Sequence, residues 1–241
     1  TMSASLSAFT GFANTAVNGE YIFAGINSDV KPLDDFLAAG SPAKAAFDAE
    51  LAGFFDPPKT KEEMTKDDMA QFLGHIEKVF LGSEPSVSGD DFWTTSVSSA
   101  SNENMKSRIG PNEVVESSTN ANSQGMRYFA LAAIVSIEFM TTDMDADARK
   151  LVGEAVRGTY VSKSMSGLTQ QRTTIGIYTE RVSKAEESLK AQEDILTTHL
   201  GSLQDVDAAE AATRVTTLQT LLETAYSVTS RLQQLSLVNF L

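Results

Sequence analysis

Carboxylates spaced two residues apart are the feature of this sequence that comes nearest to a chemical site. In the segment 143–147, Asp-Met-Asp-Ala-Asp, three carboxylates alternate as at positions one, three and five of a calcium-binding loop, and Glu154 follows at position twelve. The sixth position is Ala148, although the sharp turn of such a loop requires glycine, and two basic residues come next. We therefore interpret the segment as the acidic start of a helix, where carboxylates meet the positive end of the helix dipole, and expect no metal there.

The remaining residues that could do chemistry stand apart from one another. We interpret the two histidines, His75 and His199, as structural or surface imidazoles, and Asp205 and Asp207 as the N-terminal cap of the last helix. The motifs of nucleotide-binding loops, zinc proteases and serine hydrolases are absent, and so is cysteine. We expect a protein that is not an enzyme, without catalytic residues, cofactor or metal.

The composition narrows the classes of partner. The chain has 241 residues and a net charge of −13, so phosphate backbones and anionic membranes would repel it, and we expect neither nucleic acid nor a membrane as partner. Apolar residues make up 41% of the chain, which is enough for a core. The longest apolar run falls short of the roughly 18–20 residues that a membrane span needs, and the first residues lack the pattern of a signal peptide.

The first part of the chain has the pattern of short elements joined by turns. We predict a helix over 2–17, a hairpin over 18–34 with a strand at 21–23, and helices over 43–55 and 60–81. A Ser-Pro pair precedes the second helix and a Thr-x-x-Glu pattern opens the third, and both are signals for a helix N-terminus.

The next stretch changes to a composition rich in serine, asparagine, glycine and threonine. Over 83–123 we predict two strands, one at 92–97 and one at 109–115, with loops around them. The helix that follows, over 124–140, is so apolar at its centre that we expect it to be buried. These elements predict a small α+β domain at 35–140.

From residue 146 the composition changes to that of long, proline-free helices. Over 146–204 apolar residues recur every seven positions, which predicts a helix packed in a bundle through the core heptad residues Leu168, Ile175, Val182, Leu189, Leu196 and Leu203. A second apolar seam runs from 211 to 232. Because its stripe fits another helix, we expect an assembly interface made of Leu218, Leu222, Tyr226, Leu232, Leu235, Leu237, Phe240 and Leu241.

Three stretches give the chain a family resemblance. "GEYIFAGINSDVKPL" at 19–33 is similar to the loop-and-hairpin signature of bacterial flagellins and of hook-associated protein 3, the hook–filament junction family. "NMKSRIGPNEVVESSTNAN" resembles part of the variable region of some members. The D-V-D-x-x-E-A-A-T-R segment at 205–214, the Q-T-x-L-x-x-x-Y helix at 219–226 and the ending S-L-V-N-F-L are similar to the C-terminal region of hook-associated protein 3. The resemblance covers about 18–34 and 165–241, and the middle only loosely.

The resemblance implies a mainly α fold with a small α+β insert, in which a long helical-bundle, flagellin-like core carries a hairpin and an inserted variable domain. On this interpretation residues 1–34 are a core helix and flagellin-type hairpin, and 35–140 are the inserted domain. Residues 141–204 are the long core helix, and 205–241 are a C-terminal polymerisation helix.

The resemblance also implies a function. It indicates a structural subunit that joins hook to filament by helical self- and co-assembly, outside the cell in the bacterial flagellum, after secretion through the flagellar export apparatus. The implied partners are flagellin, a hook-side junction protein, further copies in a ring, and an export chaperone. The family has a long N-terminal helical region that would precede Ser3, pair with the C-terminal helix and carry the export signal.

Three alternatives stay open. The chain is alternatively flagellin itself, the filament subunit, which would form long fibres on its own. It is alternatively an acidic helical adaptor with no flagellar role, or an enzyme with distant residues that converge in the 35–140 domain.

Overall fold

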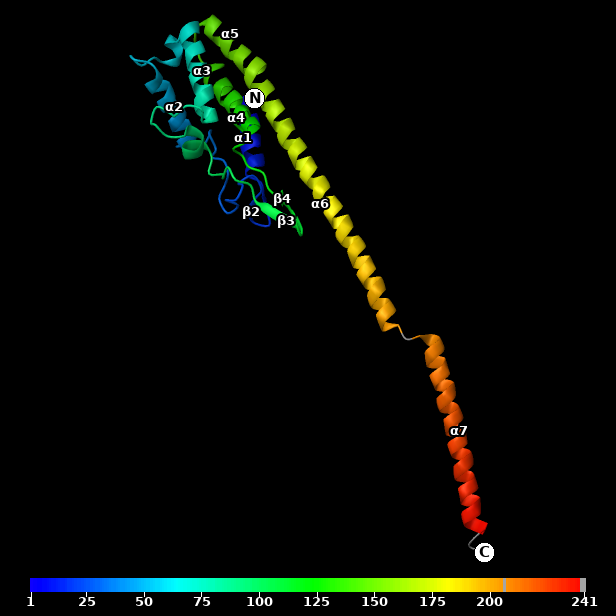
Figure 1. Cartoon of the computed structure of the whole chain (residues 1–241). Coiled ribbons are helices and arrows are strands. Elements are labelled where there is room, and N and C mark those ends of the chain that lie inside the picture. Colours follow the sequence, from blue (N-terminus) through cyan, green and yellow to red (C-terminus); the bar gives the residue numbers. More distant parts are fainter. Residues whose placement is uncertain (206, 239–241) are drawn as a thin grey trace. The chain divides into compact units, whose positions relative to one another are not determined.

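The chain divides into two compact units in the computed structural model, which describes residues 1–205 and 207–238, without the side chains of 235–238. The first unit is Thr1–Ala185 and the second is Glu186–Leu241. The long helix α6 (Val161–Gln204) contributes to both. Figure 1 gives the order of the elements along the chain.

The first unit begins with a helix and a tight hairpin. Helix α1 (Met2–Ala13) buries Leu6 and Phe9, and the Phe9 ring stacks on Phe129 at 4.4 Å between centroids. Strands β1 (Ala16–Val17) and β2 (Glu20–Tyr21) pair antiparallel. Asn18 and Gly19 between them have φ of 54° and 87°, the left-handed values that a two-residue hairpin turn of this kind needs. The predicted hairpin is confirmed, but the helix ends before residue 17 and the strand at Tyr21.

Helices α2 (Pro42–Phe54) and α3 (Lys66–Leu81) follow. The Ser41 hydroxyl accepts a hydrogen bond from the Lys44 amide at 3.3 Å, which confirms the predicted start of α2. The predicted helix over 60–81 is confirmed from Lys66 onward, and the predicted capping box of Thr60 and Glu63 is present, but it opens a separate one-turn 3₁₀ helix, η1 (Lys61–Glu63), which is followed by a second cap. There the Thr65 amide donates to Asp68 at 3.0 Å and the Asp68 amide donates to Thr65 at 3.3 Å, so α3 starts afresh.

The serine-rich stretch contains one hairpin rather than the two separate strands expected. Strands β3 (Lys106–Gly110) and β4 (Glu113–Glu116) pair antiparallel. The strand predicted at 92–97 is wrong, since Trp93–Val97 form a short π-helical turn, η2. Asp91 caps this turn by accepting from the Thr94 amide at 2.9 Å, and the turn directs Phe92, Trp93 and Val97 into the core.

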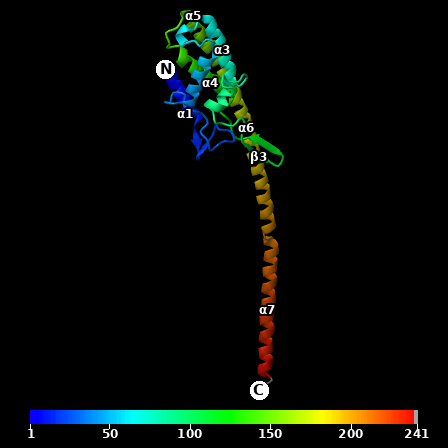
Figure 2. The same cartoon turned by 90° about the vertical axis from the view of Figure 1, so that its left-hand side faces the viewer.

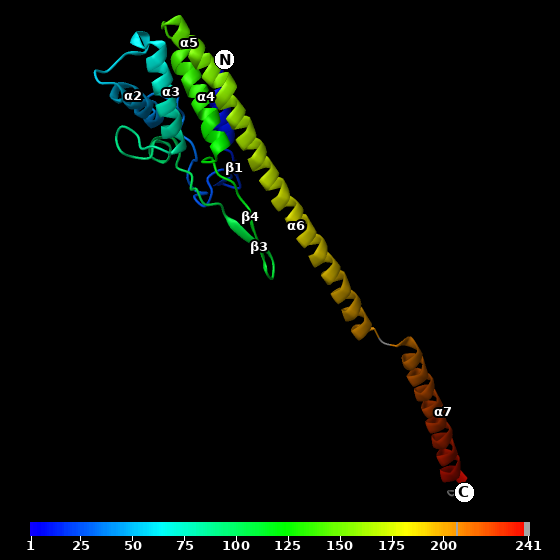
Figure 3. The same ribbon diagram turned by 45° about the horizontal axis from the view of Figure 1, so that its top comes forward.

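Helix α4 (Gln124–Phe139) lies at the centre of the core, in contact with α1, α3, α5 (Ala146–Glu154) and the π-helical turn η3 (Ala155–Tyr160). Figure 3 shows α3 and α4 side by side. Thirteen of the sixteen residues of α4 are buried, which confirms that this apolar helix is internal. The core draws on residues from Leu6 to Tyr160 and so includes side chains on both sides of residues 34 and 140.

The helical half of the chain is not a single helix from residue 146. The π-helical turn η3 separates α5 from α6, and there the Tyr160 hydroxyl donates to the Leu73 carbonyl at 3.2 Å. Local widening of the helix is a known feature of such turns. Burial raises the pKa of Tyr160 far above its usual value, so this phenol keeps its proton and stays a donor.

The second unit consists of the end of α6 and of a separate helix, α7 (Ala208–Val238). Figure 2 shows the length of α7 without a break. None of its described side chains is buried. Across the described residues of the whole chain, every helix is too short or too polar to span a bilayer. The elements together confirm a mainly α fold with a small α+β part.

Candidate functional site

Two of the carboxylates that looked most like a cation site, Asp145 and Asp207, are helix caps. Asp145 accepts a hydrogen bond from the Ala148 amide at 2.9 Å at the start of α5, as interpreted from the sequence. Asp207 does the same for α7, with its carboxylate 2.8 Å from the Ala209 amide. Within the described residues, histidine and carboxylate side chains form no group of three or more that could hold a metal ion.

His75 is a structural imidazole, as interpreted from the sequence. Its Nε2 lies 2.9 Å from a carboxylate oxygen of Glu50, and its ring stacks on Phe54 at 4.6 Å between centroids. His199 lies exposed on α6. The contacts with Glu50 and Phe54 hold the His75 ring in place, which is a structural role.

Helix α6 is fixed to the core through two glycines that touch backbone to backbone. A Cβ atom added to Gly167 would lie 2.7 Å from the Cα and the amide nitrogen of Gly125 on α4. One turn earlier on α6, the Ser164 hydroxyl donates to the Gly125 carbonyl at 3.0 Å. Residues without side chains let helix axes come this close, so this contact sets the position of the first turns of α6.

A charged contact near the start of α6 adds to this attachment. Glu77 on α3 accepts hydrogen bonds from the Tyr128 hydroxyl at 2.8 Å and from Lys163 Nζ at 2.7 Å. The bond to Glu77 raises the pKa of Lys163, while burial raises the pKa of Tyr128. Both side chains are therefore protonated donors at neutral pH, and they hold α3, α4 and α6 to one carboxylate.

Beyond this attachment, one face of α6 borders an open groove. The groove has a volume of about 1380 Å³, and its opposite wall is the β3–β4 hairpin. The apolar side chains on its walls are Ile22, Phe23, Ile109, Val115, Tyr128, Ile175, Tyr178 and Val182. Of the described residues that line it, Glu116 and Lys163 are charged and the rest are neutral. A partly apolar groove whose lining carries one negative and one positive side chain suits an amphipathic helix better than a strongly charged ligand.

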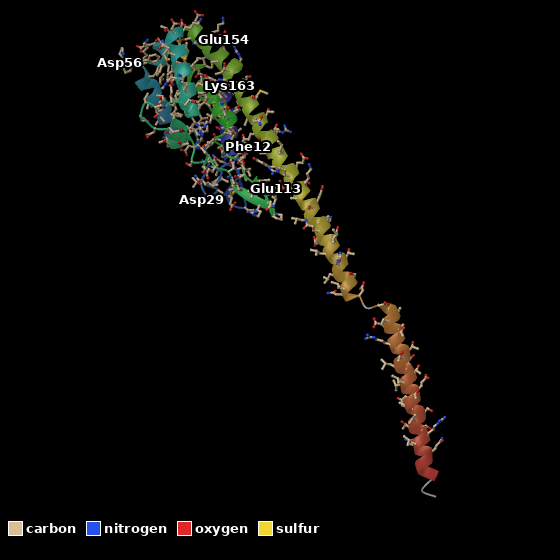
Figure 4. All side chains as sticks on the ribbon, viewed as in Figure 1. Phe12, Asp29, Asp56, Glu113, Glu154 and Lys163 are labelled. Atoms are coloured by element: carbon tan, nitrogen blue, oxygen red, sulfur yellow. The ribbon has the colours of Figure 1, made fainter. Side chains whose placement is uncertain are left out.

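Both ends of the groove are tied to α6. At one end Gln171 accepts from the Ser123 hydroxyl at 2.9 Å and donates to Thr119. At the other end Arg181 Nε lies 2.8 Å from a carboxylate oxygen of Glu113 at the tip of the hairpin. Figure 4 labels Glu113 on the hairpin and Lys163 on α6.

The predicted core heptad changes environment along α6. Leu168 packs partly buried against the core. Ile175 and Val182 line the groove and are 44% and 42% exposed, so the groove leaves them half covered. The later members, Leu189, Leu196 and Leu203, are exposed. The seam therefore begins in the core and continues as an open surface on α6.

The predicted assembly interface lies on an exposed face of α7. Leu218, Leu222, Tyr226 and Leu232 are each more than half exposed. Leu235 and Leu237 lie in the helix, but their side chains are outside the described part of the chain, and so are Phe240 and Leu241 altogether. Val215, Leu221 and Val228, which are also exposed, belong to the same broad apolar face.

A second face of α7 carries a row of threonines, here called the threonine ridge: Thr213, Thr217, Thr220 and Thr224. Each hydroxyl donates to the carbonyl oxygen four residues earlier, at 2.7–3.0 Å. With the hydroxyl turned to its own helix, the methyl group of each threonine faces outward. The described part of α7 thus presents two rows of apolar groups.

Comparison with known families found one match, which covers the C-terminal part of the chain. Residues 159–241 match the family model of the bacterial flagellin C-terminal helical region. This match supports membership of the flagellin family. It points to a structural, non-enzymatic subunit of the bacterial flagellum, which is an extracellular appendage. No curated protein and no solved structure is similar enough to the chain to count as a match.

The sequence analysis missed the glycine contact and the groove. Gly125 and Gly167 are separated by more than forty residues, and a lone glycine in a helical pattern signals a close approach without naming its partner. The β3–β4 hairpin could not be predicted as a wall of the groove for the same reason. Glu113 and Arg181 are far apart in the sequence, and only the folded chain brings them into contact.

Proposed function

We propose that this chain is the structural subunit that joins the flagellar hook to the filament. It acts by helical self-assembly and by co-assembly with flagellin on one side and a hook-side junction protein on the other. The observation that carries the proposal is the exposed apolar face of α7 in a stretch that matches the flagellin C-terminal helical region. Burial of one such leucine contributes roughly 1.5–3 kcal/mol, and repetition around a homo-oligomeric ring would make a strong joint.

The groove beside α6 supports the same function. Ile175 and Val182 line the groove and stay 44% and 42% exposed, so a helix bound in the groove would cover them. In the family the helical N- and C-terminal regions pair, so we propose that a helix of the N-terminal region or of a neighbouring subunit continues the seam along α6. The described parts of 205–241 are then the polymerisation helix, 141–204 supplies the long core helix, and 35–140 is the inserted variable domain of a subunit that is secreted to the flagellum.

An export chaperone is a further proposed partner. An amphipathic helix such as α7, when unassembled, has the form that hydrophobic grooves of partner proteins bind. The alternatives are flagellin itself and an acidic helical adaptor, and assembly behaviour separates the three functions.

The test is assembly on isolated hook structures that carry the hook-side junction protein. A junction subunit should bind these tips, allow added flagellin to grow from them, and form no long fibres alone in the electron microscope. Long fibres from the chain alone would favour flagellin, and no binding to either component would favour the adaptor.

Two matched substitutions connect the test to α7. Leu222→Gln places a polar side chain in the apolar face of α7 and should abolish binding to the hook tips. Glu223 is the next residue and lies outside that apolar face, so Glu223→Gln should leave binding unchanged. Equal binding by both variants would refute the role of this face. Hydrogen exchange in 208–238 should slow on assembly for the same reason.

A further inference from the structure

Glu50 on α2 is a buried carboxylate with two different partners. It is 1% exposed. One of its oxygens accepts a hydrogen bond from the Val87 amide at 2.7 Å, and the other lies 2.9 Å from His75 Nε2. Val87 belongs to the loop 82–91 between α3 and η2, so this carboxylate holds the loop to α2 and α3 at the same time.

His75 also faces a second carboxylate, and that one lies in the loop itself. Its Nδ1 is 3.8 Å from a carboxylate oxygen of Glu84. Glu84 is paired in addition with Lys78 on α3, at 2.7 Å. The charged groups that face this imidazole are therefore Glu50 from α2 and Glu84 from the loop, with Lys78 behind Glu84, while the Phe54 ring covers one side.

The two protonation states of His75 hold the loop differently. A neutral imidazole that donates from Nε2 to Glu50 presents the lone pair of Nδ1 to Glu84, which gives no attraction. An imidazolium carries a proton on both nitrogens and attracts both carboxylates. The hydrogen bond from Lys78, with a smaller contribution from His75, lowers the pKa of Glu84, so Glu84 stays an anion while an imidazole titrates.

We propose that His75 is a pH-dependent tie that holds the loop 82–91 against α2 and α3. Protonation of His75 adds its attraction for Glu84 to the contact with Glu50 and closes the loop more firmly. Loss of that proton leaves Glu84 with Lys78 alone, an exposed pair, and the loop opens more often. The inference concerns the inserted part of the chain and does not depend on the assembly function.

The test measures hydrogen exchange at the Val87 amide, the donor to Glu50, as a protection factor corrected for the intrinsic pH dependence of exchange. In the full chain, protection at about pH 5.5 should exceed protection at about pH 8 roughly two- to five-fold, which is the range of one solvent-exposed ion pair. His75→Gln keeps a donor toward Glu50 and cannot take a charge, so the ratio should fall to one. An unchanged ratio in His75→Gln, or a ratio of one in the unsubstituted chain, would overturn the proposal.

Two further variants complete the test. His199→Gln removes the other histidine, on α6, and should keep the full ratio; loss of the ratio there would also overturn the proposal. If the amide of Leu131 in α4 loses protection in His75→Gln, the core has been disturbed, and Glu84→Gln then replaces it as the test variant. Glu84→Gln removes one of the two carboxylates that the imidazolium attracts and keeps the Glu50 contact, so it should lower the ratio without bringing it to one, and an unchanged ratio would overturn the proposal.

Discussion

The glycine contact between α4 and α6 gives the sharpest test of how α6 is attached. Gly167→Ala adds a Cβ atom that would lie 2.7 Å from two backbone atoms of Gly125. Backbone atoms cannot rotate away as a side chain does, so α6 has to move off the start of α4. Forcing one extra carbon into a packed site typically costs about 1–3 kcal/mol.

The same helix supplies a matched control, since alanine has a higher helix propensity than glycine. Gly176→Ala on α6 meets no atom within 4 Å, so it should stabilise the helix by up to about 1 kcal/mol. Gly167→Ala has the same propensity gain but also the steric cost. The difference in unfolding free energy between the two variants is therefore the steric cost alone, about 1–3 kcal/mol in favour of Gly176→Ala.

The chain provides its own probe for this measurement. Its single tryptophan, Trp93, is fully buried in the core that Gly125 belongs to, so its fluorescence reports unfolding of the first unit. At about 2–4 °C per kcal/mol for a unit of this size, the two melting temperatures should differ by roughly 2–12 °C. Equal stabilisation by Gly167→Ala and Gly176→Ala would refute the close contact.

Two further predictions concern the first unit. Asn122→Ala removes the buried acceptor of Trp93 Nε1 (2.7 Å) and of the Ser98 hydroxyl (2.6 Å), so unfolding in urea followed by tryptophan fluorescence should show a loss of about 2–4 kcal/mol. If Asn122→Ala lowered the unfolding free energy no more than an alanine substitution at an exposed asparagine does, the buried hydrogen-bond network would be contradicted. Hydrogen bonds from Lys59 and from the start of α3 lower the pKa of Asp68 to about 2, so its stabilising charge is present at neutral pH and is lost as pH falls through about 2. Carboxyl NMR should give this midpoint and show a rise toward about 3.9 in Lys59→Met; an unchanged midpoint would exclude the ion pair as a cause.

Sequence reasoning succeeded where the deciding interactions are local. The start of α2 follows from a serine cap and the proline after it, which act within one turn. The burial of α4 follows from a run of apolar residues too long for one face of a helix. The hairpin turn at Asn18 and Gly19 follows from the two residue types that accept positive φ.

Sequence reasoning failed where local signals competed or where contacts are distant in the chain. The β-propensity of the aromatic, valine and threonine residues at 92–97 favoured a strand, but the cap supplied by Asp91 and the burial of Trp93 and Val97 favour a helical turn. Thr65 carries the capping signal that divides 60–81, and that signal was overlooked. The groove depends on a hairpin that meets α6 across more than sixty residues, which no local pattern encodes.

The threonine ridge of α7 changes what a neighbour has to provide. Each of its hydroxyls already has an acceptor in its own helix, so covering the ridge removes no unpaired donor from water. A partner therefore needs only a complementary shape, and no matching hydrogen-bond groups at fixed positions. Recognition by shape alone tolerates differences in sequence, so one and the same helix face can pack against neighbours that are not identical to each other.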